Sequence, residues 1–429
     1  MRGWLKNWEN MRQNYVAVLG AGISGKGACS LLKQLGWESY TYNEQGRAFT
    51  KEEARACSFV ICSPGFALDH PWRKIALNVG KKIISEIELA SAFSDSDVTI
   101  ITGTNGKTSL TTFLTHLWNC NQKKAISAGN VGVSFCDLVA KGMDKGKRVF
   151  LEMSSFQSAD TNDLMADSLL WTNFDQDHID YHGNLEKYFY SKAKMLNFVK
   201  NDKCFLGQSV SRHAKILGLN LSDHNIVSRD EKDWGLPDYH FMRSYPQQEN
   251  LSLGYQFSKE MGFNDQAFHR AVQSYIPEGH RLHFVKTVGE SRFWNDSKST
   301  NFSSALAACK NFKGNLFWIG GGRDKGGNIV EFVKNLKPLI KKAFLFDETG
   351  GQLYQLLKDS GSTGILCKSL EQAVVYAHEN VVKKTNILFS PGFASFDLFD
   401  DYIHRGNSFI KYVLNLKMLS TTSRHLEGS

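Results

Sequence analysis

Short apolar runs alternate with amphipathic stretches along most of the 429-residue chain. Runs that are apolar throughout indicate strands buried on both faces, and the stretches between them place apolar residues at helical spacing. The expected strands are Tyr15–Leu19, Glu38–Tyr42, Phe59–Cys62, Lys82–Ile84, Val98–Thr102, Arg148–Glu152, Ser168–Thr172, Arg292–Asn295, Leu316–Ile319, Ala343–Phe346, Gly364–Cys367 and Thr385–Phe389. Such an alternation predicts an α/β fold with doubly wound parallel sheets.

Two interruptions of this alternation divide the chain into three expected domains. A polar stretch, Ser94 to Asp97, marks the first boundary, and the alternation begins again at Arg292 after a second boundary at Val288. We therefore expect a Rossmann-like N-terminal domain over 1–93, a central P-loop ATPase α/β domain over 94–288 and a C-terminal Rossmann-like domain over 289–429. Length alone favours about two to four domains, because one compact core rarely grows this large.

The segment Thr102–Thr108 forms a loop between the apolar run Asp97–Ile101 and a stretch of helical character. A loop in this place can surround phosphate oxygens with backbone N–H groups, and the helix N-terminus favours negative charge. Lys107 would reach the β- and γ-phosphates, and the Thr108 hydroxyl would bind Mg²⁺. The motif predicts that the protein uses a nucleoside triphosphate, although Ile101 stands where the general pattern has a glycine.

Composition and charge exclude several classes of protein. The chain is 42% hydrophobic and 22% charged, and its net charge of +8 is spread without the long like-charged run of a nucleic-acid arm. No apolar run approaches the ~18 residues of a membrane span, and Met1–Asn14 lacks the apolar core of a signal peptide. The eight scattered cysteines are expected to be small buried hydrophobes. We expect a cytoplasmic protein that binds neither nucleic acid nor membrane.

The first predicted strand is followed by Gly20-x-Gly22-x-x-Gly25, a glycine pattern that lets a backbone approach a pyrophosphate at a helix N-terminus. The ligand could be NAD, FAD or a UDP-sugar. The glycines could equally serve only a tight strand-to-helix turn, and the acid expected some twenty residues further on is at best Glu44. Ser63-Pro64-Gly65 follows another strand at the same sheet edge, which favours a ligand crevice there.

Acidic residues follow two strands of the central domain. Glu152 ends a predicted strand, where a carboxylate can hold Mg²⁺ or simply face solvent. The segment Asp175–Asp180 packs three acids around His178, which favours a metal–phosphate site over a solvated turn. Lys192 and Lys194 lie on a helix predicted over 185–199, and helical lysines are usually solvated.

Three polar loops follow strands of the C-terminal domain, at the edge where ligands bind in such sheets. They span Asn295–Asn301, Gly320–Gly326 and Ser390–Asp397. Part of the polarity of the first loop could be helix capping, since it opens a helix with Asp, Ser and Thr. Together the three loops predict one ligand-binding rim.

Six segments occur in an order that resembles the Mur ligases of peptidoglycan synthesis, and the resemblance covers nearly the whole chain. They are Thr-Gly-Thr-Asn-Gly-Lys-Thr, Glu-Met-Ser-Ser-Phe-Gln, Asp-His-Ile-Asp, Gly-His-Arg, Asn-Asp-Ser-Lys-Ser-Thr-Asn and Ser-Pro-Gly-Phe-Ala-Ser-Phe-Asp. Ser-Ser-Phe-Gln after the glutamate, together with Ser-Pro-Gly in the first domain, is most similar to the D-glutamate-adding branch of the family.

The resemblance implies a role for each matching position. The catalytic residues would be Lys107, Glu152, His178 and Lys192, and the metal ligands would be Thr108, Glu152, His178 and a carbamylated Lys192, with Lys194 as the alternative lysine. ATP would be bound by Gly103, Thr104, Asn105, Gly106, Lys107, Thr108, Ser109, Asn250, Arg281 and Asp296. The UDP-linked substrate would contact Ile23, Ser24, Asn43, Gly65, Asn130, Ser154 and Gln157. The amino-acid pocket would contain Thr300, Lys325, Ser395, Phe396 and Tyr402, where Tyr402 replaces a common phenylalanine.

The reaction implied by the resemblance is ATP-dependent addition of D-glutamate to UDP-N-acetylmuramoyl-L-alanine through an acyl phosphate, with Mg²⁺ as cofactor and ADP as product. The three domains would then bind the UDP-linked substrate, ATP and the amino acid, in a protein expected to be a monomer. The alternatives are a Mur or folylpolyglutamate-type ligase with another amino-acid acceptor, an NAD-dependent oxidoreductase that uses Gly20–Gly25, and a nucleotide-binding switch without catalysis.

Overall fold

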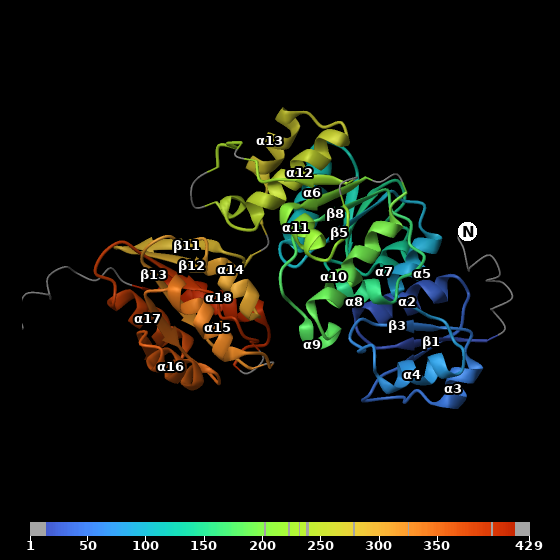
Figure 1. Cartoon of the computed structure of the whole chain (residues 1–429), viewed down its shortest axis with the longest axis horizontal. Helices are drawn as coiled ribbons and strands as arrows, with labels where there is room; N and C mark the ends of the chain where they lie inside the picture. The colour runs from blue at the N-terminus through green and yellow to red at the C-terminus, as the bar shows by residue number, and fades with distance from the viewer. Residues whose placement is uncertain are drawn as a thin grey trace, which may run out of the picture. The chain divides into compact units, whose positions relative to one another are not determined.

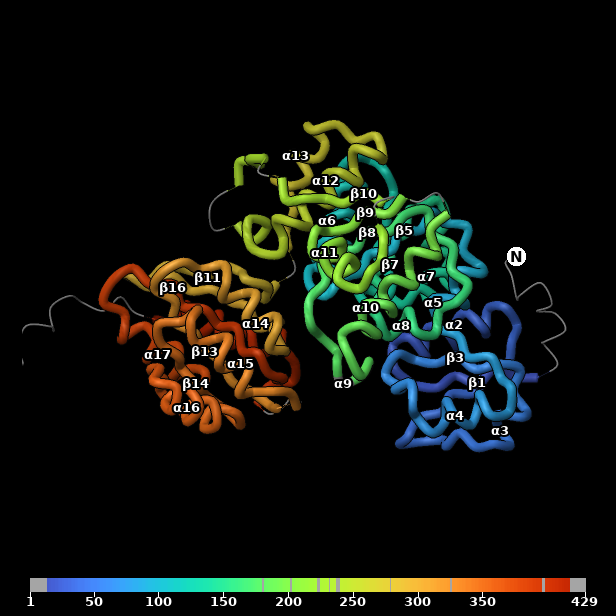
Figure 2. Tube along the Cα trace, in the orientation of Figure 1, coloured from blue at the N-terminus to red at the C-terminus, as the bar shows by residue number. Residues whose placement is uncertain are grey.

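The computed structural model describes residues 14–200, 203–221, 224–230, 232–236, 240–277, 279–324, 326–395 and 398–416, and only the backbone of Asp180. The chain divides into two compact units. One comprises Met1–Trp234 and Glu249–Tyr275, and the other comprises Gly235–Gln248 and Ile276–Ser429. The first unit contains two sheets and the second contains one (Figures 1 and 2).

The N-terminal sheet is parallel and has four strands in the order β2-β1-β3-β4. Its strands are β1 (Val16–Leu19), β2 (Ser39–Tyr42), β3 (Val60–Cys62) and β4 (Ile83–Ile84). Its helices are α2 (Ile23–Gln34), α3 (Lys51–Ala56), α4 (Pro71–Asn78) and α5 (Glu86–Phe93). Strands β1, β3 and β4 are short and apolar, β2 is short and more polar, and the helices return the chain so that the strands can pair in parallel.

The central sheet, also in the first unit, has six parallel strands in the order β10-β9-β8-β5-β7-β6. They are β5 (Val98–Thr102), β6 (Ala125–Gly129), β7 (Arg148–Glu152), β8 (Ser168–Trp171), β9 (Cys204–Gly207) and β10 (Asn225–Val227). The helices around it are α6 (Lys107–Cys120), α7 (Phe135–Ala140), α8 (Ser155–Ala159), α9 (Ile179–His182), α10 (Leu185–Ala193), η2 (Lys194–Phe198), α11 (Gln208–Ile216), α12 (Gln247–Glu260) and α13 (Asp265–Ser274).

The order of these strands places a switch point beside β5. The chain leaves β5 toward β6 and β7 on one side, and it leaves β8, the other neighbour of β5, toward β9 and β10 (Figure 2). Loops that diverge in this way open a crevice at the carboxyl ends of the strands. The crevice between β5 and β8 is therefore the first place to look for a ligand site.

Burial explains why the central elements form. All five residues of β5 are buried, as expected for a strand covered on both faces. Helix α6 buries Leu110, Phe113, Leu114 and Leu117, whose spacing of three and four residues forms one apolar stripe. One continuous apolar cluster joins the helices of the N-terminal sheet to the central sheet. The two sheets of the first unit thus share a core.

The sheet of the second unit has six strands in the order β11-β12-β16-β13-β14-β15, and only β11 runs antiparallel to its neighbour. The strands are β11 (His283–Val288), β12 (Ser291–Asn295), β13 (Leu316–Gly320), β14 (Lys342–Leu345), β15 (Gly364–Leu366) and β16 (Thr385–Phe389). The helices are α14 (Phe302–Cys309), α15 (Ile329–Leu336), α16 (Gly350–Asp359), α17 (Leu370–Glu379) and α18 (Tyr402–Leu414), with the short helices η3 (Phe241–Arg243) and η4 (Lys337–Leu339). The three polar loops follow the adjacent strands β12, β16 and β13.

The structure confirms the predicted fold class and all twelve predicted strands. The ends of these strands differ from the prediction by no more than one residue. Four further strands, β6, β9, β10 and β11, were not predicted. The helix predicted over 185–199 is wrong in its extent, because α10 ends at Ala193 and a 3₁₀ helix, η2, continues to Phe198. Among the described helices, none combines the length and apolar character needed to cross a bilayer. The domain boundaries at 93/94 and 288/289 stay a prediction.

Candidate active site

The loop between β5 and α6 is held against the end of β8. The Thr172 hydroxyl and the Asn173 amide both donate to the Asn105 carbonyl, over 2.8 and 2.9 Å. The backbone N–H of Asn105 donates in return to Asn173 Oδ1 over 2.9 Å. Gly103 lies at φ +147°, and a Cβ there would stand 1.9 Å from Thr172 Oγ1. This position therefore requires glycine, and the loop is fixed before any ligand binds.

The first residue of α6, Lys107, folds back over the loop. Its ammonium donates to the carbonyls of Gly103 and Thr104, both over 3.0 Å. On the other side of the loop, the buried Asn250 of α12 donates its amide to the Gly106 carbonyl over 3.1 Å. Phosphate oxygens can replace these carbonyls as partners of the lysine, because they carry more negative charge.

Lys192 of α10 reaches the same loop from the interior. Its side chain is 1% exposed, and its ammonium donates to the Gly103 carbonyl over 2.8 Å. Burial, followed by the nearby positive charge of Lys107, lowers the pKa of Lys192 well below its usual value, against the opposing charges of Asp177 and Glu152. An amine in this setting is reactive toward electrophiles, because it is more often neutral.

Lys194, two residues further along, is directed elsewhere. Its ammonium donates to the carbonyls of Ser158 and Ala159 and to Asn162 Oδ1, so it satisfies the end of α8. Only Lys192 of the two lysines contacts the phosphate loop.

Glu152 ends β7 next to the loop and is 1% exposed. One carboxylate oxygen, Oε1, accepts from the Asn130 amide over 3.1 Å. The other, Oε2, is buried and accepts no hydrogen bond from any residue that the structure describes. A buried carboxylate oxygen without a donor is costly, so this atom is suited to a cation. Thr108, which opens α6 after Lys107, adds a half-buried hydroxyl at the same sheet edge.

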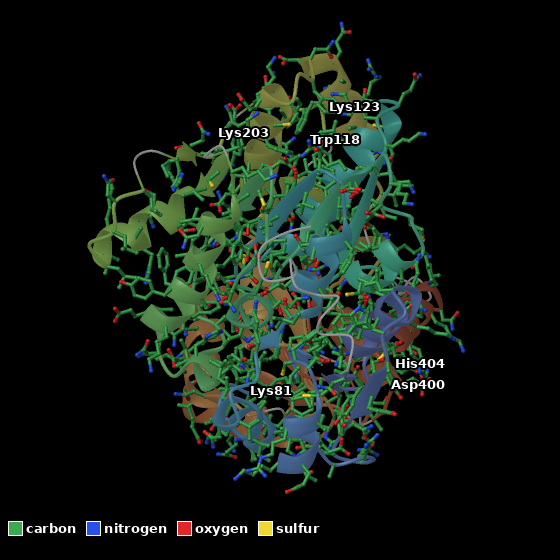
Figure 3. The ribbon with its side chains drawn as sticks, turned by 90° about the vertical axis from the view of Figure 1, so that its right-hand side faces the viewer. Lys81, Trp118, Lys123, Lys203, Asp400 and His404 are labelled. Carbon is green, nitrogen blue, oxygen red and sulfur yellow. The ribbon has the colours of Figure 1, made fainter. Side chains whose placement is uncertain are left out.

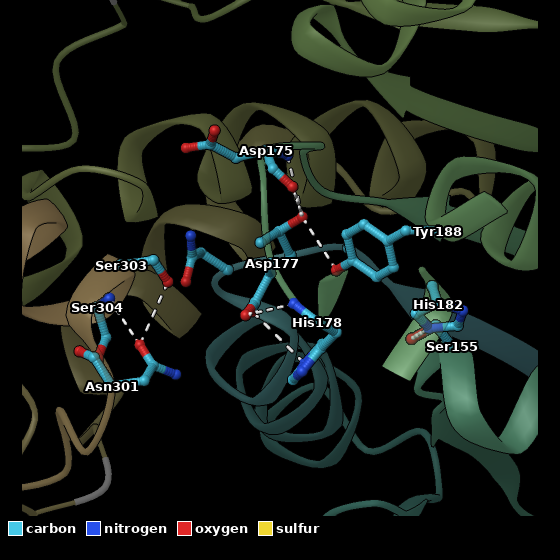
Figure 4. A network of polar contacts seen from close by, with 12 residues as sticks. Ser155, Asp175, Asp177, His178, His182, Tyr188, Asn301, Ser303 and Ser304 are labelled. Atoms are coloured by element: carbon cyan, nitrogen blue, oxygen red, sulfur yellow. Dashed lines mark hydrogen bonds and ion pairs between the residues drawn. The ribbon is translucent and has the colours of Figure 1, made fainter. Parts of the chain in front are cut away.

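The acidic segment after β8 also lies at this edge. Asp177 Oδ2 stands 3.5 Å from His178 Nε2, and His178 adopts a left-handed backbone at φ 52° (Figure 4). The imidazole packs edge-on against Phe156, with ring centroids 4.7 Å apart. The backbone N–H of Asp175 donates to the Thr104 hydroxyl over 3.0 Å, which ties this segment to the phosphate loop. The side chain of Asp180 lies outside the described residues.

Ser154 and Gln157 are engaged with one another at the start of α8. The Ser154 hydroxyl accepts from the backbone N–H of Gln157, and Gln157 Oε1 accepts from the backbone N–H of Ser154, which forms a capping box. Their polarity is thus explained in part by local structure. Ser109 is also buried, with a hydroxyl that has no partner among the described residues.

In the N-terminal sheet, the loop after β1 is closely packed. A Cβ at Gly25 would stand 1.9 Å from the Gly20 carbonyl, so the strand-to-helix turn itself requires this glycine. Ile23 is 71% exposed and Ser24 is half-buried at the start of α2. Asn43 follows β2 and Gly65 follows β3, so both lie at the same sheet edge. An exposed isoleucine at a carboxyl edge is suited to cover a flat ring.

In the second unit, Asp296 is the buried centre of the loop after β12. One of its carboxylate oxygens accepts from the backbone N–H of Leu282 over 3.0 Å, and the other accepts from the hydroxyls of Ser390 and Ser299. Burial raises the pKa of Asp296 to about 6, although these hydrogen bonds and the charge of Arg281 oppose the shift. The carboxylate joins the loops after β12 and β16.

Arg405 of α18 joins the same two loops and was not predicted. Its guanidinium is 1% exposed and donates to the carbonyls of Ser297, Phe393 and Ala394. Tyr402, at the start of α18, accepts from the Ser297 hydroxyl through its backbone carbonyl over 2.8 Å.

The remaining predicted pocket residues are placed only in part. Ser395, just after the Arg405-held carbonyls, is 2% exposed, and Thr300 is half-buried. Lys325 and Phe396 lie outside the described residues.

Comparison with known proteins places these features in a family. The Mur ligase middle domain model matches residues 101–230. A UDP-N-acetylmuramoylalanine–D-glutamate ligase of Aquifex aeolicus is 31% identical over 409 residues, with 92% of this chain and 97% of the relative covered. The enzyme of the same name from Halalkalibacterium halodurans is 28% identical, with 96% and 100% covered.

Two solved structures show the same fold. A UDP-N-acetylmuramate–alanine ligase of Thermotoga maritima has a TM-score of 0.57 at 14% identity and covers 94% of this chain and all of that one. A folylpolyglutamate synthase of Mycobacterium tuberculosis, solved with ADP and AMPPCP, has a TM-score of 0.56 at 12% identity over 77% and 94% of the two chains.

Proposed function

We infer the reaction of this chain from its family: it belongs to the UDP-N-acetylmuramoylalanine–D-glutamate ligases, the MurD family. It is an ATP-dependent ligase that adds D-glutamate to UDP-N-acetylmuramoyl-L-alanine in peptidoglycan synthesis. The finding that carries this conclusion is the relative at 31% identity, which aligns over nearly all of both chains. The resemblance drawn from the sequence motifs is thereby confirmed.

The residues at the carboxyl edge of the central sheet would activate the carboxyl group of the substrate. An amide cannot form from a carboxylate and an amine in water without activation, so we propose that the alanyl carboxylate attacks the γ-phosphate of ATP and forms an acyl phosphate and ADP. Lys107 would exchange its two carbonyl partners for phosphate oxygens and balance their charge. The amine of D-glutamate then attacks the acyl carbon, and phosphate leaves.

The donor set beside the phosphate loop suits Mg²⁺. The buried Glu152 Oε2 and the Thr108 hydroxyl are hard oxygen ligands of the type that Mg²⁺ prefers, and His178 lies at the same edge. When bound, Mg²⁺ would neutralise charge on the phosphate oxygens. Asn130 would hold the Glu152 carboxylate in place through its amide.

We propose that Lys192 carries a carbamate. The ammonium would first lose one proton, and the neutral amine nitrogen would then bond to the carbon of CO₂ and release a second proton. The product is an anionic carbamate with two oxygen atoms. Its burial, its direct contact with the Gly103 carbonyl and the nearby Glu152 support this assignment over Lys194, whose ammonium is occupied at the end of α8.

For the other predicted residues, we propose the binding roles that the motif resemblance implies. We propose that Gly103–Ser109 and Asn250 bind ATP, with Arg281 and Asp296 as further contacts. Ile23, Ser24, Asn43, Gly65, Ser154 and Gln157 would bind the UDP-linked substrate. Thr300, Lys325, Ser395, Phe396 and Tyr402 would bind D-glutamate, and Arg405 would position the loop that carries Ser395. We further propose a cytoplasmic monomer, which light scattering on purified protein can test.

An acceptor screen tests the function. UDP-N-acetylmuramoyl-L-alanine and ATP are supplied with D-glutamate, L-glutamate, L-alanine or a diamino acid, and ADP and amide product are both measured. We expect product only with D-glutamate, at one ADP per amide. A preference for another acceptor would contradict the assigned substrate, and amide formation without ADP would contradict the mechanism.

A matched pair of variants tests the carbamate. Lys192→Ala should lose activity by about a hundredfold or more, since it removes a group beside the phosphates, whereas Lys194→Ala should stay within severalfold of the wild type. Short carboxylic acids such as formate should restore part of the activity of Lys192→Ala by occupying the vacated anionic position. Full activity of Lys192→Ala would overturn the assignment.

A further inference from the structure

A second hollow lies at the opposite edge of the central sheet, where strands β5, β6 and β7 begin. It has a volume of about 510 Å³ and lies between the segments that precede these three strands, the end of α6 and Met261 after α12. Its side chains include Trp118 and Lys123, which lie next to one another in Figure 3. None of its residues belongs to the site described above.

The walls of this hollow are fixed by hydrogen bonds. The buried Asp144 accepts from the hydroxyls of Ser94 and Ser96 over 2.7 and 3.2 Å, which ties the segment before β5 to the turn before β7. Arg148 pairs with Asp97 over 3.0 Å and binds the two segments a second time. A cavity with walls tied in this way keeps its shape in the free protein.

Beneath the hollow, Trp118 is packed among aromatic side chains. Trp118 is 4% exposed and stacks on Phe257 with ring centroids 5.6 Å apart, while Phe263 lies 4.5 Å from it. The ammonium of Lys123 is held at the rim, because it donates to the Met261 carbonyl and lies 4.1 Å from the Phe263 ring.

Positive charge in the hollow exceeds negative charge. Arg148 is neutralised by Asp97, which leaves three lysines against one carboxylate, that of Asp95. Among the residues that the structure describes, the ammonium groups of Lys124 and Lys147 form no hydrogen bond or ion pair, and that of Lys123 contacts only a carbonyl and a ring. Several cations that line one concave surface produce a positive field there.

We propose that this hollow is a second anion site, which binds a small phosphorylated molecule independently of the phosphate loop. Lysine ammonium groups are strong donors to phosphate oxygens, and the volume lies within the ~300–1,000 Å³ of small-molecule sites. Phosphate is the shared chemistry of inorganic polyphosphate and of nucleotides. Protection by different phosphates separates the two sources.

The position of the hollow allows both sites to be occupied at once. Strands β5, β6 and β7 run from it to Gly103, Asn130 and Glu152, and each has five residues. At about 3.3 Å per residue, roughly 15 Å of sheet separates the two sites. A ligand in the hollow therefore does not compete for the phosphate loop.

Site-resolved labelling tests this proposal on the full chain. Pyridoxal 5′-phosphate is a phosphorylated aldehyde that forms an imine with a nearby lysine, and borohydride reduces the imine to a stable adduct that peptide mapping locates. We expect Lys124 or Lys147 to be labelled about tenfold faster than the exposed Lys33 and Lys215, with protection by inorganic tripolyphosphate. Labelling at the same rate as the two reference lysines, without protection, would overturn the proposal.

Protection by different phosphates then identifies the source. Uridine and adenosine nucleotides that protect at lower concentration than tripolyphosphate support a ligand with an organic part. Equal protection by all of them supports recognition of the phosphate chain alone. Both results support the anion site and distinguish its ligands.

A binding measurement provides an independent test. Equilibrium dialysis with labelled tripolyphosphate should give two sites per wild-type chain and one, that of the phosphate loop, in Lys124→Gln/Lys147→Gln. The charge-matched control Lys33→Gln/Lys215→Gln should keep both sites, and unchanged thermal midpoints would show that the variants are folded. The same number of sites in Lys124→Gln/Lys147→Gln as in the wild type, or equal loss in the control, would refute the proposal. Neither result affects the ligase assignment, because the acceptor screen does not depend on this hollow.

Discussion

A buried ion pair between the two sheets of the first unit gives a strong test of the fold. Arg73 of α4 and Asp160, which follows α8, form two parallel hydrogen bonds of 2.6 Å, and their side chains are only 6% and 9% exposed. Arg73 also donates to the Cys62 sulfur over 3.2 Å. The change Asp160→Asn keeps the shape of the side chain and removes its charge.

The expected loss follows from what this change leaves behind. The new amide has a single acceptor oxygen, so it accepts from only one guanidinium nitrogen and one of the two hydrogen bonds is lost. A charge-assisted hydrogen bond of this kind contributes about 1.5–3 kcal/mol. The Arg73 charge stays buried without a counter-ion, and removing one partner of a buried pair costs about 3–5 kcal/mol in total. We expect the free energy of unfolding to fall by about 3–5 kcal/mol, whereas Arg73→Met in the same chain should restore part of this loss.

Equilibrium unfolding in urea, followed by circular dichroism and tryptophan fluorescence, measures the change. The control is Lys141→Gln, which removes a 2.7 Å pair with Asp137 on the surface of α7, where the lysine side chain is 58% exposed. An exposed pair of this kind contributes about 0.3–0.5 kcal/mol. If Asp160→Asn costs no more than Lys141→Gln, the buried pair does not hold the two sheets together and the reasoning is wrong.

Two further predictions concern a buried acid and two glycines. Glu86 is fully buried and accepts from the backbone N–H of Cys136, and burial raises its pKa from 4.5 to about 7. Because the folded state binds this proton more tightly than the unfolded state, the free energy of unfolding falls as pH rises from about 4.5 to 7. At about 1.36 kcal/mol per pKa unit, the free energy of unfolding of the wild type should fall between pH 5 and pH 8 by up to about 3 kcal/mol more than that of Glu86→Gln. An equal fall in the two proteins would contradict this. Gly103→Ala should lower ATP affinity by about tenfold or more in a titration, because the new Cβ meets Thr172. Gly351→Ala in α16, where a Cβ has open space, should instead raise the free energy of unfolding by about 0.5–1 kcal/mol. Unchanged ATP affinity of Gly103→Ala would show that the loop can shift without cost.

Much of the fold could be predicted from the sequence because its strands are locally distinct. The strand Val98–Thr102 consists of β-branched residues, which favour strands, and the phosphate loop follows it directly, so both were placed correctly. The strand Ala125–Gly129 was missed, since Ala and Gly have low strand propensity and only pairing with β7 fixes its conformation. The predicted helix over 185–199 ends as an α-helix at Ala193 and continues as a 3₁₀ helix, a change that the apolar spacing does not indicate.

The site was predictable where chemistry follows a strand. Glu152 ends one strand, and the phosphate loop and the segment around His178 follow two others of the same sheet, in which parallel strands end at the same edge. The contacts of Thr172 and Asn173 with the loop join positions 67 and 68 residues apart. No local pattern encodes such a contact, although the rule that strand ends carry function would have selected both residues.

Buried donors from helices explain what the strand rule leaves out. Lys192 of α10 donates to the Gly103 carbonyl, and Asn250 of α12 donates to the Gly106 carbonyl. Arg405 of α18 does the same for the Phe393 and Ala394 carbonyls in the second unit. Loops whose N–H groups face a ligand leave their carbonyls directed into the protein, where each needs a donor. A helix can supply that donor from any distance along the chain, so these residues look like ordinary solvated side chains until the fold is known.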